Sequence, residues 1–320
     1  MVKYVLKRVA LMLLTLFIIS TMCFVLIHLL PEAPILRGIG KDPNLQVIER
    51  ERQGLNDSII AQYGRFLANI FAYGYWGNGL QMYKTSEVTE IIGQKMPYTI
   101  VLNLWSIILS VPLGLLFGIY AALRKNRWQD HLISVLVVIF ISVPSYVYAF
   151  LVQYILCFKL GWFDLQIKSL ADASIMSPAM FYSMLPAIFS LGFGTVAGLT
   201  RYTRAELSEV LTSEFMLLAR TKGLTKRQAT TRHALKNAMV VILPMIIGEF
   251  IGILSGSLII EGIFGVPGIG SLYITSIRMR DYNFFMALTV FYTFIGLLGG
   301  IVIDISYGFI DPRIRMGSRK

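Results

Sequence analysis

Long runs of apolar residues alternate with short polar segments along this chain. A run of about 20 apolar residues crosses the ~30 Å of bilayer hydrocarbon as one helix, because each helical residue rises about 1.5 Å. Such runs occur near residues 9–30, 98–123, 132–157, 180–199, 239–261 and 284–309. The composition agrees, since 56% of the 320 residues are hydrophobic and 15% are charged. The pattern predicts an all-α integral membrane protein with six transmembrane helices.

The first apolar run has two interpretations, a secretory signal peptide or a permanent membrane anchor. Lys3, Lys7 and Arg8 precede it, as a signal peptide requires. The run is nevertheless longer than the roughly 7–15 residues of a signal core, and it lacks a small-x-small cleavage site. We therefore predict an uncleaved N-terminal transmembrane helix over residues 1–30.

Basic residues indicate how the spans are oriented. Of the 29 Lys and Arg, more than half fall in short segments that share one side of the predicted spans. They are Lys3, Lys7, Arg8, Arg124, Lys125, Arg127, Arg201, Arg204, Arg220, Lys222, Lys226, Arg227, Arg232, Lys236, Arg313, Arg315, Arg319 and Lys320. The positive-inside rule then places both termini in the cytoplasm, with residues 310–320 as a cytoplasmic tail. Because these cations are spread along the membrane surface, we expect contact with lipid and not with nucleic acid.

Residues 31–97, between the first two spans, are far longer than a simple connection. Apolar residues recur at helical spacing within DSIIAQYGRFLANIFAYG, residues 57–74. We expect a small helical cap on the extracytoplasmic surface. Two roles stay open for this cap: packing onto the outer ends of the helices, or docking a soluble partner.

The sequence offers no catalytic constellation. Neither HExxH nor GxSxG occurs, and the three histidines lie in separate segments. The phosphate-binding pattern GxxxxGK[ST] is also absent, so that any dependence on ATP has to be supplied by another chain. We therefore expect neither an enzyme nor a cofactor site in this chain.

Glu249 lies near the middle of the fifth apolar run. A carboxylate there costs about 3 kcal/mol unless it is paired, protonated or hydrated, so its side chain must face protein or water. Two interpretations stay open: Glu249 lines a translocation path, or it makes a structural hydrogen bond to a neighbouring helix.

The polar segment of residues 200–238, between the fourth and fifth spans, has the pattern helix, break, helix. Thr212 or Ser213 can cap a short helix with Glu214 in its first turn and Arg220 and Lys222 in its last. The glycine at position 223 is suited to the left-handed conformation that ends such a helix. The sequence TKRQ at 225–228 fits a capping box that begins the next helix. A sharp corner between two capped helices is therefore predicted.

Phe215, Leu217 and Leu218 are too apolar for a freely solvated loop. A short rigid helix with exposed apolar side chains suits insertion into a groove on another protein. A helix lying on the lipid surface is the alternative.

Several stretches resemble the transmembrane permease subunits of ABC importers, in particular the oligopeptide and dipeptide branch. Glu214, Phe215 and Met216, through Ala219 to Gly223, look like a degenerate copy of the cytoplasmic E-A-A…G signature of that family. Asn283 stands where the branch has a proline. Further stretches similar to the branch are LLPEAP (29–34), PLGLLFGIYAALRKNRWQD (112–130), SVPSYVYA (142–149), LGW (160–162), RYTRAELSEVL (201–211), ARTKGL (219–224), RHALKNA (232–238), EGIFGVPGIG (261–270), RDY (280–282) and DPRIR (311–315).

The resemblance implies an ABC-importer permease fold with a five-helix core over residues 98–309, in a bacterial plasma membrane. This chain and a second, homologous permease would enclose the path, and two cytoplasmic ATP-binding subunits, which hold ATP and magnesium, would drive it. An extracytoplasmic substrate-binding lipoprotein would deliver the peptide. Peptide length stays open, as do nickel or glutathione as cargo. The alternative, a self-contained secondary transporter or channel, would need more ionisable groups in the spans than Glu249 and Asp304.

The residues discussed above and the resemblance together indicate candidate site residues. The residues expected to couple to the ATPases are Glu214, Phe215, Leu218, Ala219, Lys222 and Gly223, with Ala219 on the face buried against the partner. The residues expected along the translocation path are Glu249, Phe264, Pro267 and Gly268. Of these, Phe264 is expected to act as an apolar plug or anchor in the outer turn after the fifth helix.

Overall fold

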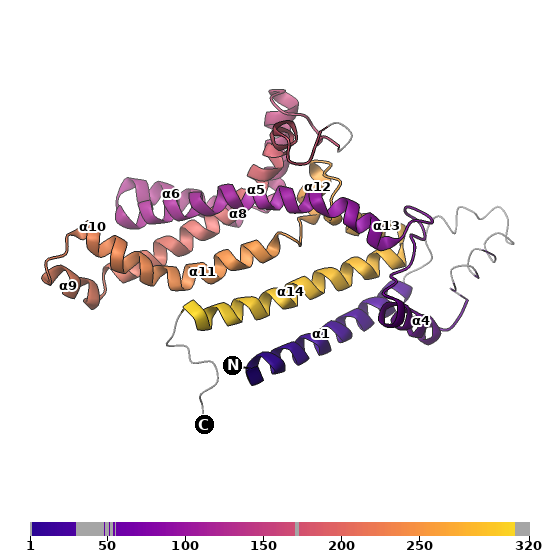
Figure 1. Ribbon diagram of the computed structural model, residues 1–320. Coiled ribbons are helices and arrows are strands. Elements are labelled where there is room, and N and C mark those ends of the chain that lie inside the picture. Colours follow the sequence, from indigo (N-terminus) through magenta and orange to yellow (C-terminus); the bar gives the residue numbers. More distant parts are fainter. Residues whose placement is uncertain are drawn as a thin grey trace.

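The computed structural model describes residues 2–29, 56–169 and 173–310, together with positions 48, 51 and 54. In these parts the regular structure is helical, apart from two isolated β-bridges within residues 78–87. The helices form an elongated bundle (Figure 1). Helices α9 and α10, the start of α1 and the end of α14 lie toward one end, and α4 and α13 lie toward the other.

Helices α1 (Val2–Leu29) and α14 (Tyr282–Ile310) lie side by side (Figure 1). Arg8 and Asp304 form an ion pair of 2.8 Å between them. The cap helix α4 (Ile59–Tyr73) crosses the far end of α1, where the hydroxyls of Thr21 and Tyr63 are 2.5 Å apart. The predicted helix within residues 57–74 is confirmed, and its described part packs onto the membrane helices.

The most extensive helix contact in the described part of the chain joins α5 (Val88–Leu123) to α8 (Pro178–Leu211). Gly118 makes this close approach possible, because a Cβ there would lie 2.5 Å from the Cβ of Thr203. Small residues at a membrane helix interface let two backbones approach closely. Helix α5, which contains the predicted second span, begins at Val88 and not at residue 98. Its first turns thus belong to the segment that the sequence predicts as an extracytoplasmic loop.

The third predicted span, residues 132–157, is not one straight helix. Helix α6 (Trp128–Ser142) is followed by α7 (Ser145–Val152) and the π-helical segment η1 (Gln153–Lys159), with a bend of 102° at the break. Pro144 explains the break, because proline donates no hydrogen bond and disfavours helical geometry in the residue before it. The predicted third crossing therefore stands on the condition that this bent pair forms one span.

The fifth predicted span, residues 239–261, also differs. A continuous helical stretch of α10 (Lys226–Ala229), η2 (Thr230–Ala234) and α11 (Leu235–Gly252) begins earlier and ends at Gly252. A turn then leads to the short helices α12 (Leu258–Ile263) and α13 (Ile269–Met279). The segment EGIFGVPGIG thus contributes the end of α12 and the start of α13, with a turn between them.

By length and composition, five helices in the described part can cross a membrane, and a sixth crossing results if the bent pair is one span. This agrees with the predicted number of six on that condition. The LLPEAP stretch after its first residue, Leu29, and the predicted tail after residue 310 lie outside the described residues.

Candidate functional site

The predicted corner between the fourth and fifth spans begins where α8 ends at Leu211. Ser213 occupies the N-cap position of α9 (Glu214–Thr221), but its hydroxyl donates to the carbonyl of Val210 at 2.6 Å and does not cap the helix. The predicted short helix with Glu214 in its first turn and Arg220 in its last turn is confirmed. Lys222 lies just beyond the last turn, at the C-cap position.

Gly223 turns the chain out of α9 with φ of +86°, a left-handed conformation that glycine adopts without steric cost. The amide of Leu224 donates to the carbonyl of Ala219 at 3.3 Å, which closes the helix end. Thr225 and Gln228 then form the predicted capping box of the next helix, with hydrogen bonds of 3.0 and 3.3 Å. The corner is therefore defined on both sides by local hydrogen bonds.

The two faces of α9 differ. Met216 and Ala219 are 4% and 9% exposed and pack into the apolar cluster between α8, α10 and α11. Leu217 is 64% exposed, and Phe215 and Leu218 are exposed as well. Ala219 therefore faces the chain's own core, which corrects the expectation that it is buried against a partner. The face available to another protein is formed by Phe215, Leu217 and Leu218.

At the other end of the bundle, the fully buried carboxylate of Glu261 organises the outer turn. Thr99 on α5 donates its hydroxyl to Oε1 at 2.9 Å, and the amides of Gly270 and Ser271 donate to Oε2 at 2.8 and 3.2 Å. The carboxylate thus caps the start of α13 and ties it to α5. Burial raises the pKa of Glu261, while these hydrogen bonds oppose the shift.

Gly268 is required beside this carboxylate. A Cβ at this position would clash with both the Glu261 carboxylate and the Thr99 hydroxyl. At Gly262, six residues earlier, no atom lies within 4 Å of the place that a Cβ would take, so that the steric demand is specific to Gly268.

A cavity of about 520 Å³ adjoins this turn, and we name it the outer cavity after the side on which the sequence predicts it. It is lined by residues 81–83, Lys95 on α5, Glu261 and Gly262 on α12, residues 265–268 and one face of α13. Pro267 and Gly268, two of the predicted path residues, line it. Phe264 does not, because it is 2% exposed and packs into the apolar core beside α5 and α8. Phe264 is therefore an anchor of the turn and not an exposed plug.

Glu249 lies at a different cavity, of about 320 Å³, between α7, α8 and α11. Thr195 on α8 donates its hydroxyl to Glu249 Oε2 at 3.3 Å, and Ser145 and Tyr148 from α7 line the same space. The structure thus combines the two interpretations, since Glu249 has a helix-to-helix hydrogen bond and also lines a cavity. It is not brought together with Pro267 or Gly268.

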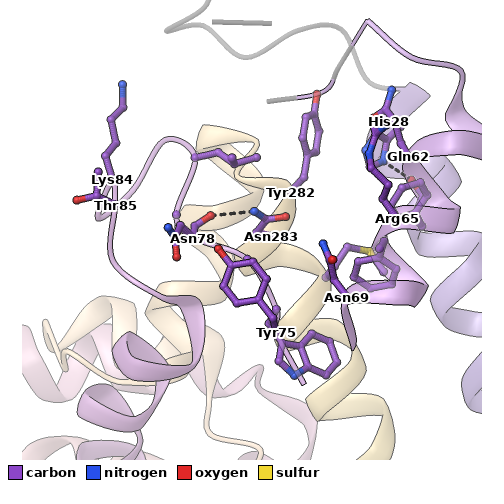
Figure 2. A pocket seen from close by; sticks show the side chains of 17 residues that line it. His28, Gln62, Arg65, Asn69, Tyr75, Asn78, Lys84, Thr85, Tyr282 and Asn283 are labelled. Carbon is purple, nitrogen blue, oxygen red and sulfur yellow. Dashed lines mark hydrogen bonds between the residues drawn. The ribbon is translucent and has the colours of Figure 1, made fainter. Parts of the chain in front are cut away.

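A third cavity, of about 460 Å³, lies between α1, α4 and the start of α14. Figure 2 shows His28, Arg65 and Asn69 on one side of it and Asn78 with Asn283 on another. Asn283, which stands where a proline was expected by resemblance, donates its side-chain amide to the carbonyl of Asn78 at 2.8 Å. The cap is therefore fastened to α14 as well as to α1.

Comparison with known proteins decides the family. The family model described as the inner membrane component of binding-protein-dependent transport systems matches residues 114–316, and the model of the N-terminal part of such membrane components matches residues 1–103. The chain belongs to this family. It is the membrane permease component of a binding-protein-dependent ABC importer.

Three relatives of this permease match over almost their whole length. The dipeptide transport system permease protein DppB of Lactococcus lactis is 35% identical over 316 residues, covering 99% of this chain and 100% of the relative. DppB of Bacillus subtilis is 32% identical, with 99% of both chains covered. The glutathione transport system permease protein GsiC of Escherichia coli K12 is 31% identical, covering 98% of this chain and 99% of the relative. The resemblance stated from the sequence is confirmed, and the alternative of a self-contained transporter or channel is set aside.

Sequence reasoning gave no role to three buried carboxylates of this permease. Besides Glu261, Asp281 accepts the amides of residues 80–82 on Oδ2 at 2.7–2.9 Å, and burial raises its pKa against these hydrogen bonds. Asp130 pairs with both Arg204 Nε and Arg204 Nη2, and it accepts the amide of Asn126. The sequence signal that could have identified these carboxylates is their position. Asp281 and Asp130 stand at helix starts, and Glu261 is an acid inside an apolar, glycine-rich stretch.

The outer turn gives a matched stability test. Gly268→Ala should lower the melting temperature of the purified permease, because overpacking of this kind costs about 1–3 kcal/mol. Gly262→Ala, in open space, should leave the melting temperature within error of the wild type. The melting temperatures are measured by heating each variant and quantifying the remaining folded protein by size-exclusion chromatography. Equal melting temperatures for both variants would show that the contact at Glu261 is not tight.

Proposed function

We propose that this permease imports peptides through a path that it forms with a second, homologous permease. The observation that carries the proposal is the α9 corner, in which a rigid, doubly capped turn presents the apolar side chains of Phe215, Leu217 and Leu218 outside the chain's own core. Apolar helical residues in such an array suit a groove on a partner protein. Two cytoplasmic subunits that bind ATP and magnesium supply this groove and the energy.

In this proposal the surface that contacts the ATP-binding subunits is formed by Phe215 and Leu218 together with Glu214, Lys222 and Gly223. The charged pair lies at the two ends of α9 and is exposed, so that both side chains can contact the partner. Gly223 fixes the direction in which the chain leaves α9 toward α10. The role of Ala219 is indirect, because it holds α9 against the core.

The orientation of the permease follows from the same proposal. Both termini lie in the cytoplasm, which is supported by the basic residues beside the spans and by the ends of α1 and α14 that share the α9 side of the bundle (Figure 1). In this orientation α1 is a membrane anchor, and the segment between α1 and α5 forms an extracytoplasmic cap. The helices from α5 to α14 form the permease core. A substrate-binding lipoprotein docks on the outer side, where the cap and the outer cavity lie, and the setting is a bacterial plasma membrane.

Peptides are the proposed cargo because relatives along the whole chain carry the names of dipeptide and glutathione permeases. Both kinds of molecule contain peptide bonds and ionised ends. A path for them needs polar groups within the membrane, and Glu249 supplies one in a cavity lined by three helices.

The corner can be tested at Gly223. Gly223→Val should abolish most peptide uptake and substrate-stimulated ATP hydrolysis, since a β-branched residue at positive φ costs at least ~1–2 kcal/mol and would reorient α9. No atom lies within 4 Å of a Cβ at this glycine, so the effect is one of backbone conformation and not of a clash. Gly223→Asn is the matched control, because asparagine tolerates the left-handed region, and it should keep most of the uptake. Normal uptake by the valine variant would leave α9 as a lipid-surface connector.

The path assignment of Glu249 has a separate test. Glu249→Gln removes the charge but keeps a side chain that can accept the hydrogen bond from Thr195. We expect peptide uptake per assembled complex, or its ratio to ATP hydrolysis, to change while the amount of complex stays the same. Loss of complex with unchanged uptake per complex would assign Glu249 a structural role alone.

A further inference from the structure

The outer cavity contains polar groups that the turn itself does not use. Its volume of about 520 Å³ falls within the roughly 300–1,000 Å³ of small-molecule sites. Glycines, Pro267 and apolar side chains make up more than half of its lining, and the polar lining residues are Gln81, Tyr83, Lys95, Glu261, Ser271 and Thr275. A cavity of this kind, largely apolar with a few polar groups that set orientation, is typical of a ligand site.

Lys95 is a half-buried cation on the wall formed by α5. Its ammonium lies 5.8 Å from the ring centre of Tyr83, and within the described residues it forms no ion pair. Glu261, the acidic residue of the same cavity, is fully buried, and its two oxygens already accept hydrogen bonds from Thr99, Gly270 and Ser271. The charge of Lys95 is therefore left for an anion that enters the cavity.

Gln81 contributes an acceptor. The residue is 8% exposed, and its backbone amide is held by Asp281 Oδ2 at 2.7 Å. Its side-chain oxygen Oε1 is buried and accepts no hydrogen bond from the described part of the chain. Because an unpaired buried carbonyl oxygen is unfavourable, turning this carboxamide toward a donor in the cavity would be stabilising.

A cation and an unused carbonyl acceptor that line the same cavity match the groups at the end of a peptide. We propose that the outer cavity receives the C-terminal end of the transported molecule, with Lys95 pairing with its carboxylate and Gln81 accepting its last peptide N–H. The inference rests on the proposed peptide cargo and assigns it a subsite. Dipeptides and glutathione both end in a carboxylate next to a peptide N–H, so that this subsite serves either cargo. A molecule whose C-terminus is amidated lacks the group that Lys95 pairs with.

The test uses the whole complex in proteoliposomes, with a reporter cysteine on the cavity wall. Met279 lines the cavity on α13 and is partly exposed, so Met279→Cys can be labelled by an impermeant maleimide. The parent protein gives the background from Cys23 and Cys157. We expect dialanine and glutathione, added at saturating concentration, to slow the labelling several-fold, while dialanine amide has little effect.

Substitutions at Lys95 make the test specific. Lys95→Gln should abolish the protection by dialanine, and Lys95→Arg, which keeps the charge, should retain it. Lys84→Gln is the matched control, since Lys84 lies on the neighbouring loop and lines the cavity of Figure 2 instead. Absence of protection in the parent reporter, equal protection by dialanine amide, or protection that Lys95→Gln leaves unchanged would each overturn the subsite.

Uptake measured in the same vesicles separates this inference from the proposed function. If the reporter complex imports peptide delivered by its binding protein but shows no protection at Met279→Cys, the subsite is wrong and peptide import stands. If it hydrolyses ATP but imports neither dialanine nor glutathione, the proposed cargo fails, and the subsite fails with it.

Discussion

The close contact of α5 with α8 is the constraint on which the rest of this permease depends. Gly118 lets the two backbones approach, and the hydroxyl of Thr200 donates to the carbonyl of Gly114 at 3.2 Å across the same interface. Helix α8 ends in the α9 corner, whereas α5 carries Thr99, which holds the Glu261 carboxylate at the outer turn. One helix pair therefore connects the proposed ATPase surface to the outer cavity.

Buried carboxylates fasten other elements to this pair. Asp130 joins the turn between α5 and α6 to Arg204 on α8, and Asp281 joins the start of α14 to the loop before α5. A buried charge is costly unless it is paired and hydrogen-bonded, and a buried ion pair often adds little net stability over apolar packing. We interpret these contacts as devices that fix relative positions. Helix α6 is held to α8 in this way, and α7, which follows it after the bend, lines the Glu249 cavity.

Local signals in the sequence were sufficient for the corner. The left-handed Gly223 and the capping box of Thr225 and Gln228 depend on neighbours within a few residues, so their conformation could be derived without the fold. The number of spans followed from apolar length, although the 102° bend at Pro144 did not. A proline indicates where a helix can break, but the size of the bend depends on packing with other helices.

Long-range contacts account for what the sequence could not predict. Glu261 is defined by Thr99, which lies 162 positions away in the chain. The eight-residue helix α9 has apolar side chains all round, so that spacing alone could not separate the buried Met216 and Ala219 from the exposed Leu217. The burial of Phe264 also depends on distant helices, because its side chain packs against α5 and α8. Its local sequence therefore could not show that Phe264 anchors the turn.

The most direct test of this account is a cross-link from α9 to an ATP-binding subunit in native membranes. Cys23 and Cys157 are replaced by alanine, and single cysteines are introduced by Leu217→Cys and Met216→Cys. The cysteine at the exposed position 217 should cross-link to the ATP-binding subunit through a short thiol-to-amine reagent. This cross-link would also place α9 in the cytoplasm. The cysteine at the buried position should not cross-link. Equal cross-linking from both positions, or none from Leu217→Cys in a complex that imports peptide, would contradict the proposed docking face.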